Sequence, residues 1–519
     1  MKSRKGILLI IISVLFLHSL INFFILDKSK IIRDGDEVNY FSEIIHFDSI
    51  LARGEYKNLI AYMSETAIVM HHPKFFFLVS SFIYNSFKKI GLEDINLIIL
   101  STNAFFLFIL LVSVYQIGSI FYDRKTGLLA IVLLSFSPII FGYSRMFLLD
   151  LPLAAMISLC LLLLLKTRNF DSLFFSIFTG ISFSLAQYTK EAAIIFILSS
   201  FLYYSYSSLR IIDKKRHRFI NFSIAIMLSL FLLGILYLNP SNKELFKIYW
   251  EKIFLVHSYK GEDLLYYVKI FPFRYLGIIF SIASLPLVLR YIFKVRKENL
   301  FLVLWFFIPF LIFSISHNKV PRFMIPALPP LYLILASEIF GLRPIKVRYI
   351  YIYALILISA FQYIKFNFFP RIPSGYSVHE TGLLNIYKDK NFPVMKRLLY
   401  FFDEENVPSG KTANIIFTFR EIQRGLTLEF LLNKMPFFIN CPIDSDVVYA
   451  PPPGKTNWEE YLLTADYVVD KSGYIKWRGA LEDITSAFKK SLEENAHIFK
   501  KVESFDNSDG DTISIYKKY

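Results

Sequence analysis

The chain has 519 residues, of which 55% are hydrophobic, 18% are aromatic and only 19% are charged. A soluble globular chain carries about 25% charged residues, so this composition excludes an entirely soluble protein and indicates a polytopic membrane protein with some soluble mass. The formal net charge of +15 does not predict a nucleic-acid partner, because most basic residues fall in short gaps between apolar runs. Cys160 and Cys441 are too far apart for a Cys-x-x-Cys metal or redox motif.

Apolar runs follow one another from the amino terminus to residue 366. The first run, Gly6 to Leu26, comes after three basic residues, but it is too long for a signal peptide and lacks a small-residue cleavage site. We therefore expect a retained transmembrane helix there. About eleven runs are predicted to cross the bilayer, namely 6–26, 96–120, 127–145, 150–166, 170–187, 190–208, 219–238, 274–292, 299–316, 323–341 and 348–366.

An amino terminus in the cytoplasm places every strongly basic short gap inside, as the positive-inside rule requires. These gaps contain Arg124 and Lys125, Lys166 and Arg168, Lys214 to Arg218, Lys294 to Lys297, and Arg343 to Arg348. The scheme requires that the apolar segment Phe75 to Phe87 does not cross. As a helix, its roughly 13 residues span about 20 Å, less than the ~30 Å hydrocarbon core. We predict that it lies on the outer surface, within one long extracytoplasmic loop of amphipathic helices over residues 27–95.

After residue 366 the chain becomes a mixed polar sequence of about 150 residues, long enough for one soluble domain. The stretches ANIIFTF, DVVYA, ADYVVD and DTISIYKKY are typical of strands, and SAFKKSLEENAH is typical of a helix. The predicted fold is therefore mainly α: a transmembrane domain over residues 1–366, followed by an extracytoplasmic α/β domain over residues 367–519. The loop APPPGKTNW lacks the spacing of a phosphate-binding loop.

Charged residues are sparse in the gaps predicted to lie outside, so each one is a functional candidate. The first outer loop contains "RDGDEVNY", which crowds Asp34, Asp36 and Glu37 into four positions. The later outer gaps contain Arg145, Asp150, Lys190, His317, Lys319 and Arg322. Lys and Arg can hold a phosphate leaving group, while a carboxylate accepts the proton of an attacking hydroxyl. This division of charges predicts transfer of a group from a membrane-borne phosphate.

Five stretches, in chain order, resemble the GT-C glycosyltransferases of the protein O-mannosyltransferase and lipid A aminoarabinose transferase superfamily: "RDGDEVNY", "HHPKFFFL", "FYDRKTGLLAIVLLSFSPIIFGYSRMFLLDLPLAA", "YTKEAAIIF" and "NKVPRFMIPALPPLYLILA". The resemblance covers residues 1 to 340 approximately. It implies a GT-C fold and an enzyme that moves a sugar, with inversion, from a polyprenyl-phosphate donor. The acceptor, on the outer or lumenal side, would be a protein, lipid or glycan.

The resemblance also assigns roles to the acidic residues. Asp36 matches the catalytic carboxylate of the first loop, and Glu37 matches its acidic neighbour. Asp150 matches the second-loop acid that is expected to place the acceptor or the sugar, with Arg145 in a supporting position. No cofactor is required and a divalent metal is not expected, although Asp36 and Asp150 have the chemistry to hold one.

The basic residues are expected to bind the donor. Lys190, Lys319 and Arg322 match positions that face the lipid phosphate. His72 matches the His-Pro that opens the surface helix, in a supporting role. Lys74 stands where the family often has a second Pro, and it is expected to reach the donor phosphate as well.

Each candidate also has a purely structural explanation. Asp36 and Glu37 can cap the helix that follows them. Asp150 can start a helix or pair with Arg145, and Lys190 can pair with Glu191 or reach lipid headgroups.

Two other functions stay open. An oligosaccharyltransferase usually has a Trp-Trp-Asp type motif, and the chain has no Trp-Trp pair. A polytopic transporter or lipid flippase would show internal repeats, or charged and broken helices near the midplane of the membrane. The apolar runs here contain few charges, and the candidates lie at the outer ends of helices, which favours the enzyme.

Overall fold

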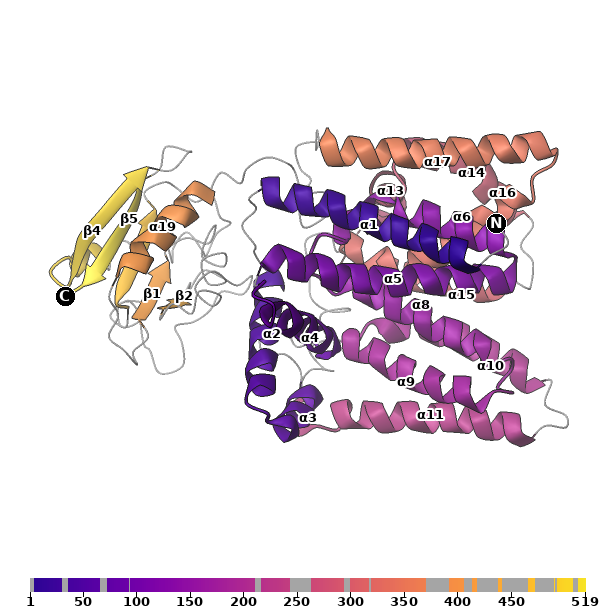
Figure 1. Cartoon of the computed structure of the whole chain (residues 1–519), viewed down its shortest axis with the longest axis horizontal. Helices are drawn as coiled ribbons and strands as arrows, with labels where there is room; N and C mark the ends of the chain where they lie inside the picture. Colours follow the sequence, from indigo (N-terminus) through magenta and orange to yellow (C-terminus); the bar gives the residue numbers. More distant parts are fainter. Residues whose placement is uncertain are drawn as a thin grey trace. The chain divides into compact units, whose positions relative to one another are not determined.

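The computed structural model describes residues 4–29, 36–65, 72–92, 94–210, 216–242, 263–293, 299–316, 319–369, 392–405, 413–417, 437–440, 465–471, 490, 492–506 and 512–519. The chain divides into two units (Figure 1). The helical unit comprises Met1–Lys28 and Glu43–Ile386, and the sheet unit comprises Ser29–Ser42 and Tyr387–Tyr519.

Helices make up the described part of the first unit. In chain order they are α1 (Arg4–Ser29), α2 (Asp36–Ala52, which begins in the residues assigned to the sheet unit), α3 (Tyr56–Ser64), α4 (Phe75–Lys88), α5 (Ile95–Phe121), α6 (Arg124–Ser135), α7 (Pro138–Tyr143), α8 (Asp150–Lys166), α9 (Leu173–Thr189), α10 (Ala193–Arg210), α11 (Arg216–Tyr237), η1 (Pro240–Asn242), α13 (Tyr266–Ile270), η2 (Phe271–Tyr275), α14 (Ile278–Ile292), α15 (Leu300–Ile315), η4 (Pro321–Ala327), α16 (Leu328–Phe340) and α17 (Ile345–Phe368).

Several of these helices are long and apolar enough to cross a membrane. Within the described ranges there are five such helices, Lys5–Leu26, Ile95–Phe121, Arg216–Tyr237, Pro321–Phe340 and Ile345–Phe368. A sixth is added if the bent pair Tyr266–Tyr275 and Ile278–Ile292 counts as one span. The mainly helical, membrane-type fold is thus confirmed, and the full set of eleven crossings stays a prediction. The surface position predicted for α4 also stays a prediction.

Local sequence signals determine where the helices begin and break. The carboxylate of Asp94 accepts hydrogen bonds from the second and third backbone amides of α5, and Asp123 caps α6 in the same way, because the first turn of a helix leaves its amide donors unpaired. The single run predicted over 127–145 is wrong in one respect, since it forms two helices. Pro138 has no backbone N–H and disfavours a helical residue before it, so α6 ends and α7 begins at this proline.

The helix α8 lies in the interior of the helical unit. It is buried along most of its length and packs against α5 and α9, while α9 packs against α11 (Figure 1). A Cβ atom built on Gly180 of α9 would lie 2.5 Å from the backbone oxygen of Ala225 in α11, so the close contact of these two helices depends on glycine at this position. Asp150, the first residue of α8, is therefore placed by a helix with neighbours on several sides.

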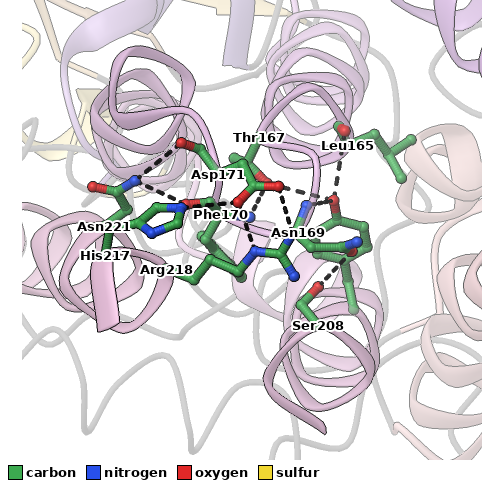
Figure 2. A network of polar contacts seen from close by, with 10 residues as sticks. Leu165, Thr167, Asn169, Phe170, Asp171, Ser208, His217, Arg218 and Asn221 are labelled. Carbon is green, nitrogen blue, oxygen red and sulfur yellow. Dashed lines mark hydrogen bonds and ion pairs between the residues drawn. The ribbon is translucent and has the colours of Figure 1, made fainter. Parts of the chain in front are cut away.

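The opposite end of α8 contains a polar network (Figure 2). The turn after α8 holds Arg168, Asn169 and Phe170 at φ values of 51°, 61° and 61°, a left-handed conformation that non-glycine residues adopt only when neighbours stabilise it. Three side chains from α10 and α11 supply that support: Tyr204, Ser208 and Asn221 bond to Asn169 N, Asn169 Oδ1 and Phe170 O, at 2.9, 3.0 and 2.8 Å.

Ion pairs complete this network. Arg218 of α11 donates two hydrogen bonds to Asp171, and His217 lies 2.9 Å from the same carboxylate (Figure 2). The residues predicted to be cytoplasmic around Arg168 and Arg218 thus lie at one end of α8, and Asp150 lies at the other.

The sheet unit contains α19 (Phe392–Glu404) and five strands, β1 (Ala413–Phe417), β2 (Phe437–Asn440), β3 (Tyr467–Lys471), β4 (Phe499–Asp506) and β5 (Thr512–Lys518). The strand order is β2-β1-β3-β5-β4. β1 is parallel to β2 and β3, whereas β5 is antiparallel to β3 and β4. The strands predicted in ANIIFTF, ADYVVD and DTISIYKKY are present, and DVVYA lies outside the described residues. Of the predicted helix SAFKKSLEENAH, residues 490 and 492–494 are helical and residues 495–497 form a turn, while the remainder lies outside the described residues.

One polar cluster joins α19 to the sheet. Glu405, directly after α19, accepts hydrogen bonds from the Tyr467 hydroxyl at 2.7 Å and from the Lys517 ammonium at 2.6 Å. Burial raises the pKa of Glu405, but these two hydrogen bonds outweigh it, and the pKa lies below its usual value. Burial and the bond to Glu405 raise the pKa of Tyr467 to about 12.

Candidate functional site

The predicted acid cluster lies at the start of α2. Asp36 and Glu37 occupy the first turn of this helix, where carboxylates interact favourably with the unpaired amides and the helix dipole. Glu37 is buried, with 6% of its surface exposed, and Asp34 lies outside the described residues. The helix that these acids were predicted to cap is therefore present, which supports their structural role. The catalytic role of Asp36 and Glu37 stays a prediction.

Asp150 is the centre of a buried ion-pair cluster in the helical unit. Its side chain is 1% exposed, and the Lys190 ammonium donates to Oδ1 at 2.8 Å. The Nε atom of Arg322 lies 3.6 Å from Oδ2. The three residues come from the start of α8, the end of α9 and η4, so residues 172 positions apart in sequence meet at one carboxylate. We call Asp150, Lys190 and Arg322 the Asp150 cluster.

These contacts correct two of the structural explanations. Asp150 does not pair with Arg145, because Arg145 donates to the side chain of Asn367 in α17. Lys190 does not pair with Glu191, because the Glu191 carboxylate lies 3.3 Å from the Nδ1 atom of His72 instead. Three of the residues predicted to lie together, Asp150, Lys190 and Arg322, are close to one another, and their placement on the outer side stays a prediction.

The segment that carries Lys319 and Arg322 is held in place by buried aromatic residues. Tyr267 donates to Val320 O at 3.0 Å, Tyr275 donates to Pro321 O at 2.6 Å, and Trp305 donates to Pro326 O at 3.0 Å. All three aromatic side chains are fully buried. Sequence reasoning missed them, because abundant aromatic residues in apolar runs are also what lipid-facing and core packing produce.

The helix that supplies Tyr267 is sharply bent. Tyr266–Tyr275 and Ile278–Ile292 meet at 114°, and Gly277 between them has a φ of +80°, which glycine adopts without steric strain. The run predicted from residue 274 therefore starts its straight helix at Ile278 and turns Tyr267 and Tyr275 toward the segment before η4. Sequence hydropathy does not report such a bend.

Lys319 lies three residues before Arg322 and is also buried, with 4% of its surface exposed. Its ammonium donates to the backbone oxygen of Ser316 at 2.5 Å. Burial lowers the pKa of Lys319, and the negative charge of Asp263 partly opposes this. The segment therefore carries two cations, Lys319 and Arg322, and Arg322 joins Lys190 at the carboxylate of Asp150.

Lys74 belongs to a second buried cluster. Its side chain is 0% exposed, its ammonium lies 3.1 Å from the centre of the Tyr62 ring, and Glu43 Oε2 lies 3.9 Å away. The Tyr62 hydroxyl donates to the same oxygen of Glu43. Burial lowers the pKa of Lys74 to about 8, while Glu43 and Glu65 raise it. We call Glu43, Tyr62 and Lys74 the Lys74 cluster.

Sequence reasoning missed Glu43, Tyr62 and Glu191 as members of the site. In the sequence, Glu43 gives only the signal of a polar residue in an amphipathic helix within residues 27–95, and such a signal is weak. Tyr62 gave no signal, because its role depends on where α3 packs. The predicted supporting residue His72 contacts Glu191, and this contact brings the start of the His-Pro-Lys segment beside Lys190.

Arg145 is fully buried away from the Asp150 cluster. Apart from the bond from its Nη2 atom to Asn367, its Nε and Nη1 atoms have no hydrogen-bond partner among the residues the structure describes. Its supporting role stays a prediction. In those same ranges, no group of three or more His, Cys, Asp or Glu side chains has the arrangement of a metal site.

Comparisons with known proteins bear on the fold. Residues 66–236 match the family model described as dolichyl-phosphate-mannose-protein mannosyltransferase. The chain is 35% identical over 101 residues to the undecaprenyl phosphate-alpha-4-amino-4-deoxy-L-arabinose arabinosyl transferase 2 of Proteus mirabilis, across 17% of this chain and 18% of that protein. It is 38% identical over 77 residues to the corresponding transferase of Pectobacterium atrosepticum, across 14% of each. The matched stretches thus span less than a fifth of these relatives.

Solved structures match over nearly the whole chain. ArnT from Cupriavidus metallidurans, bound to undecaprenyl phosphate, aligns with a TM-score of 0.62 at 12% identity and covers 99% of this chain and 98% of its own. The chain has the GT-C glycosyltransferase fold. The archaeal oligosaccharyltransferase AglB from Archaeoglobus fulgidus aligns with this GT-C chain at a TM-score of 0.51 and 10% identity, over 98% of this chain and 74% of AglB. The predicted resemblance to the GT-C superfamily is confirmed at the level of the fold.

Proposed function

We propose that the chain is an integral membrane glycosyltransferase that moves a sugar from a polyprenyl-phosphate donor to an acceptor hydroxyl on the extracytoplasmic side. The observation that carries the proposal is the Asp150 cluster, in which the buried Lys190 and the partly buried Arg322 converge on one buried carboxylate at the end of a central helix. Charged groups within a membrane bundle are expensive to bury and are typical of functional sites. Lys190 and Arg322 have the charge needed to hold a lipid phosphate as it leaves the sugar.

The proposed reaction is a single displacement. Asp36 accepts the proton of the acceptor hydroxyl while the hydroxyl oxygen forms a bond to the anomeric carbon. The bond between that carbon and the phosphate oxygen breaks, and its electron pair leaves with the phosphate. One displacement inverts the anomeric centre. The phosphate departs without protonation, so no general acid is needed, and Glu37 is the acidic neighbour of Asp36 in the first turn of α2.

Asp150 positions the cations in this mechanism. Lysine and arginine side chains are long, and a carboxylate that bonds to Lys190 and lies near Arg322 holds both in one place before the donor arrives. When the phosphate binds, it shares these cations with Asp150. Lys319 and Lys74 add further positive charge to the donor site.

The relatives support a polyprenyl phosphate as the lipid. One solved structure with the same fold is bound to undecaprenyl phosphate, and another is described in complex with a dolichol-phosphate. The acceptor is a protein, lipid or glycan. We further propose that the sheet unit lies outside the membrane and selects the acceptor; unchanged acceptor choice after deletion of residues 367–519 would contradict this role.

Two other candidate functions can be compared with the proposed hydroxyl transfer. The AglB alignment supports an oligosaccharyltransferase-like reaction, which would transfer a glycan to an asparagine amide and not to a hydroxyl. A transporter or lipid flippase is disfavoured, because Asp150, Lys190 and Arg322 lie at ends of helices and not in the middle of a spanning segment.

The test is transfer of labelled sugar from a panel of synthetic polyprenyl-phosphate sugars by the purified chain and by Asp36→Asn. Loss of a general base lowers turnover by about 10²- to 10⁴-fold. Asp171→Asn is the control, because Asp171 is a carboxylate of the helical unit that pairs with Arg218 at the end of α8 opposite to Asp150 (Figure 2). Full turnover by a folded Asp36→Asn variant would return Asp36 to the role of a helix cap, and no turnover with any donor by the wild type would favour a transporter.

A further inference from the structure

The ammonium group of Lys74 is held in an unusual way. It is fully buried, and no hydrogen-bond acceptor contacts its Nζ atom within the described part of the chain. Its neighbours are the face of the Tyr62 ring, at 3.1 Å from the ring centre, and the carboxylate of Glu43, at 3.9 Å. A lysine with this environment has hydrogen-bonding capacity left over for an anionic ligand.

Tyr62 and Glu43 reinforce one another. The hydroxyl of Tyr62 donates to the Glu43 oxygen that lies nearest to Lys74, so the carboxylate fixes the orientation of the ring. The negative face of the ring attracts the ammonium. The His46 ring packs against the Tyr62 ring, and the two ring centres are 4.5 Å apart. The Lys74 ammonium is thus held between side chains of α2 and α3.

The helix that carries Glu43 is itself fixed to the helix that follows Lys74. One turn further along α2, Asp48 accepts hydrogen bonds from Asn85 at 2.8 Å and from Lys88 at 2.5 Å, both in α4. Lys74 directly precedes α4. These bonds give α2 and α4 a definite register, so the distance between Glu43 and Lys74 follows from the packing of two helices and not from the flexible lysine side chain.

We propose that Tyr62 and Glu43 are positioning residues that hold the Lys74 ammonium ready for the donor phosphate. The inference rests on the proposed function, in which Lys74 contacts that phosphate. Tyr62 supplies a surface that attracts the ammonium without occupying its hydrogen-bond donors, and Glu43 supplies negative charge at a distance that leaves those donors free. An incoming phosphate oxygen can therefore bond to Lys74 without first displacing a direct hydrogen-bond partner.

This arrangement predicts a characteristic pH dependence. The pKa of Lys74 is about 8 because burial lowers it, so the ammonium is lost as the pH rises through 8, and the KM for the donor rises. The charged and titratable groups around it are Glu43 from α2, Tyr62 from α3 and Glu65 directly after α3. Both glutamates raise the pKa of Lys74, so neutralising Glu43 moves the alkaline limb of kcat/KM to lower pH, by about one unit for a carboxylate at this distance.

The experiment measures kcat and KM for the donor between pH 6 and 9.5 with the full-length chain, and inhibition by the polyprenyl phosphate alone. Glu43→Gln and Tyr62→Leu are expected to raise KM about tenfold at pH 8 with little change in kcat, and to shift the alkaline limb to lower pH. Tyr62→Phe keeps the ring and is expected to retain most of the donor affinity. Lys74→Arg, which stays charged at every pH used, is expected to remove the limb and so assigns it to Lys74.

Asp171→Asn is the control. It removes a paired carboxylate at the end of α8 opposite to Asp150, so the position of the alkaline limb should not change. A limb that moves equally in Glu43→Gln and Asp171→Asn would overturn the inference, as would normal donor KM in folded Tyr62→Leu. If Glu43→Gln fails to fold, the comparison of Tyr62→Leu with Tyr62→Phe decides.

Failure of the glycosyltransferase proposal would give a different experimental result from failure of the positioning role. A wild type that neither turns over any donor nor binds the polyprenyl phosphate refutes the glycosyltransferase proposal, and the role of Tyr62 and Glu43 falls with it. A wild type that does both, with a limb insensitive to Glu43 and Tyr62, refutes only the positioning role.

Discussion

Replacing Asp150 with Asn tests the Asp150 cluster directly. The amide keeps the shape of the carboxylate but removes the charge that faces Lys190 at 2.8 Å and Arg322 at 3.6 Å. At an effective dielectric constant of about 20, these attractions amount to about 6 and about 5 kcal/mol before desolvation is subtracted. Breaking one buried pair in this way destabilises a protein by about 3–5 kcal/mol, because a charge is left buried without its partner.

The measurement is a double-mutant cycle with Asp150→Asn, Lys190→Met and the double variant. Unfolding in mixed micelles is followed by the fluorescence of Trp305, in a background without the other tryptophans; this side chain is fully buried and bonds to Pro326 in η4. We expect the double variant to be more stable than the sum of the single changes predicts, by about 1–3 kcal/mol. Additivity within about 0.5 kcal/mol would show that Asp150 and Lys190 are not coupled and would refute the reasoning.

The same variant separates positioning from binding. With the carboxylate gone, Asp150 no longer competes with the phosphate for Lys190 and Arg322, so we expect Asp150→Asn to bind the polyprenyl phosphate at least as tightly as the wild type while its kcat falls. An equal loss of binding and turnover would indicate that Asp150 contributes only to the fold.

Three smaller perturbations test the packing and the sheet unit. Gly180→Ala is expected to destabilise the helical unit by about 1–3 kcal/mol, because the new Cβ meets the backbone of Ala225; wild-type stability in thermal unfolding would contradict the contact. Arg168→Gly is expected to stabilise the chain by about 0.5–1 kcal/mol in the same assay, because glycine adopts its φ of 51° without strain, and a loss of stability would refute this. Burial raises the pKa of Glu405, but the hydrogen bonds from Lys517 and Tyr467 and the charge of Lys517 together outweigh this, so the stability that Glu405 contributes is present above the ordinary glutamate pKa and is lost as the pH falls through the lowered pKa. Urea unfolding of the full chain between pH 3 and 6 should show a smaller acid loss in Glu405→Gln, and equal losses would exclude this role.

Much of the helical unit could be predicted from the amino-acid sequence alone. Apolar length and the caps at Asp94 and Asp123 are local properties, so the position of most helices could be predicted within a few residues. The predicted chain crosses the membrane repeatedly, so every second gap between helices lies on the same side of the membrane. This alternation was enough to group Asp150, Lys190 and Arg322. The break at Pro138 was also readable, although hydropathy alone merged α6 with α7.

The pairing of the charged residues depends on the tertiary structure. Whether Asp150 pairs with Arg145 or Lys190 depends on how α8 and α9 are rotated about their axes, and hydropathy has no term for that rotation. The contact between the Tyr62 ring and the Lys74 ammonium depends on the packing of α2, α3 and α4, and the members of the Lys74 cluster are 12 to 31 residues apart in sequence. Each apolar residue contributes to burial separately, so the buried helices can be recognised in the sequence. An ion pair instead depends on the relative position of two helices, and close packing determines that position only when the whole unit has formed.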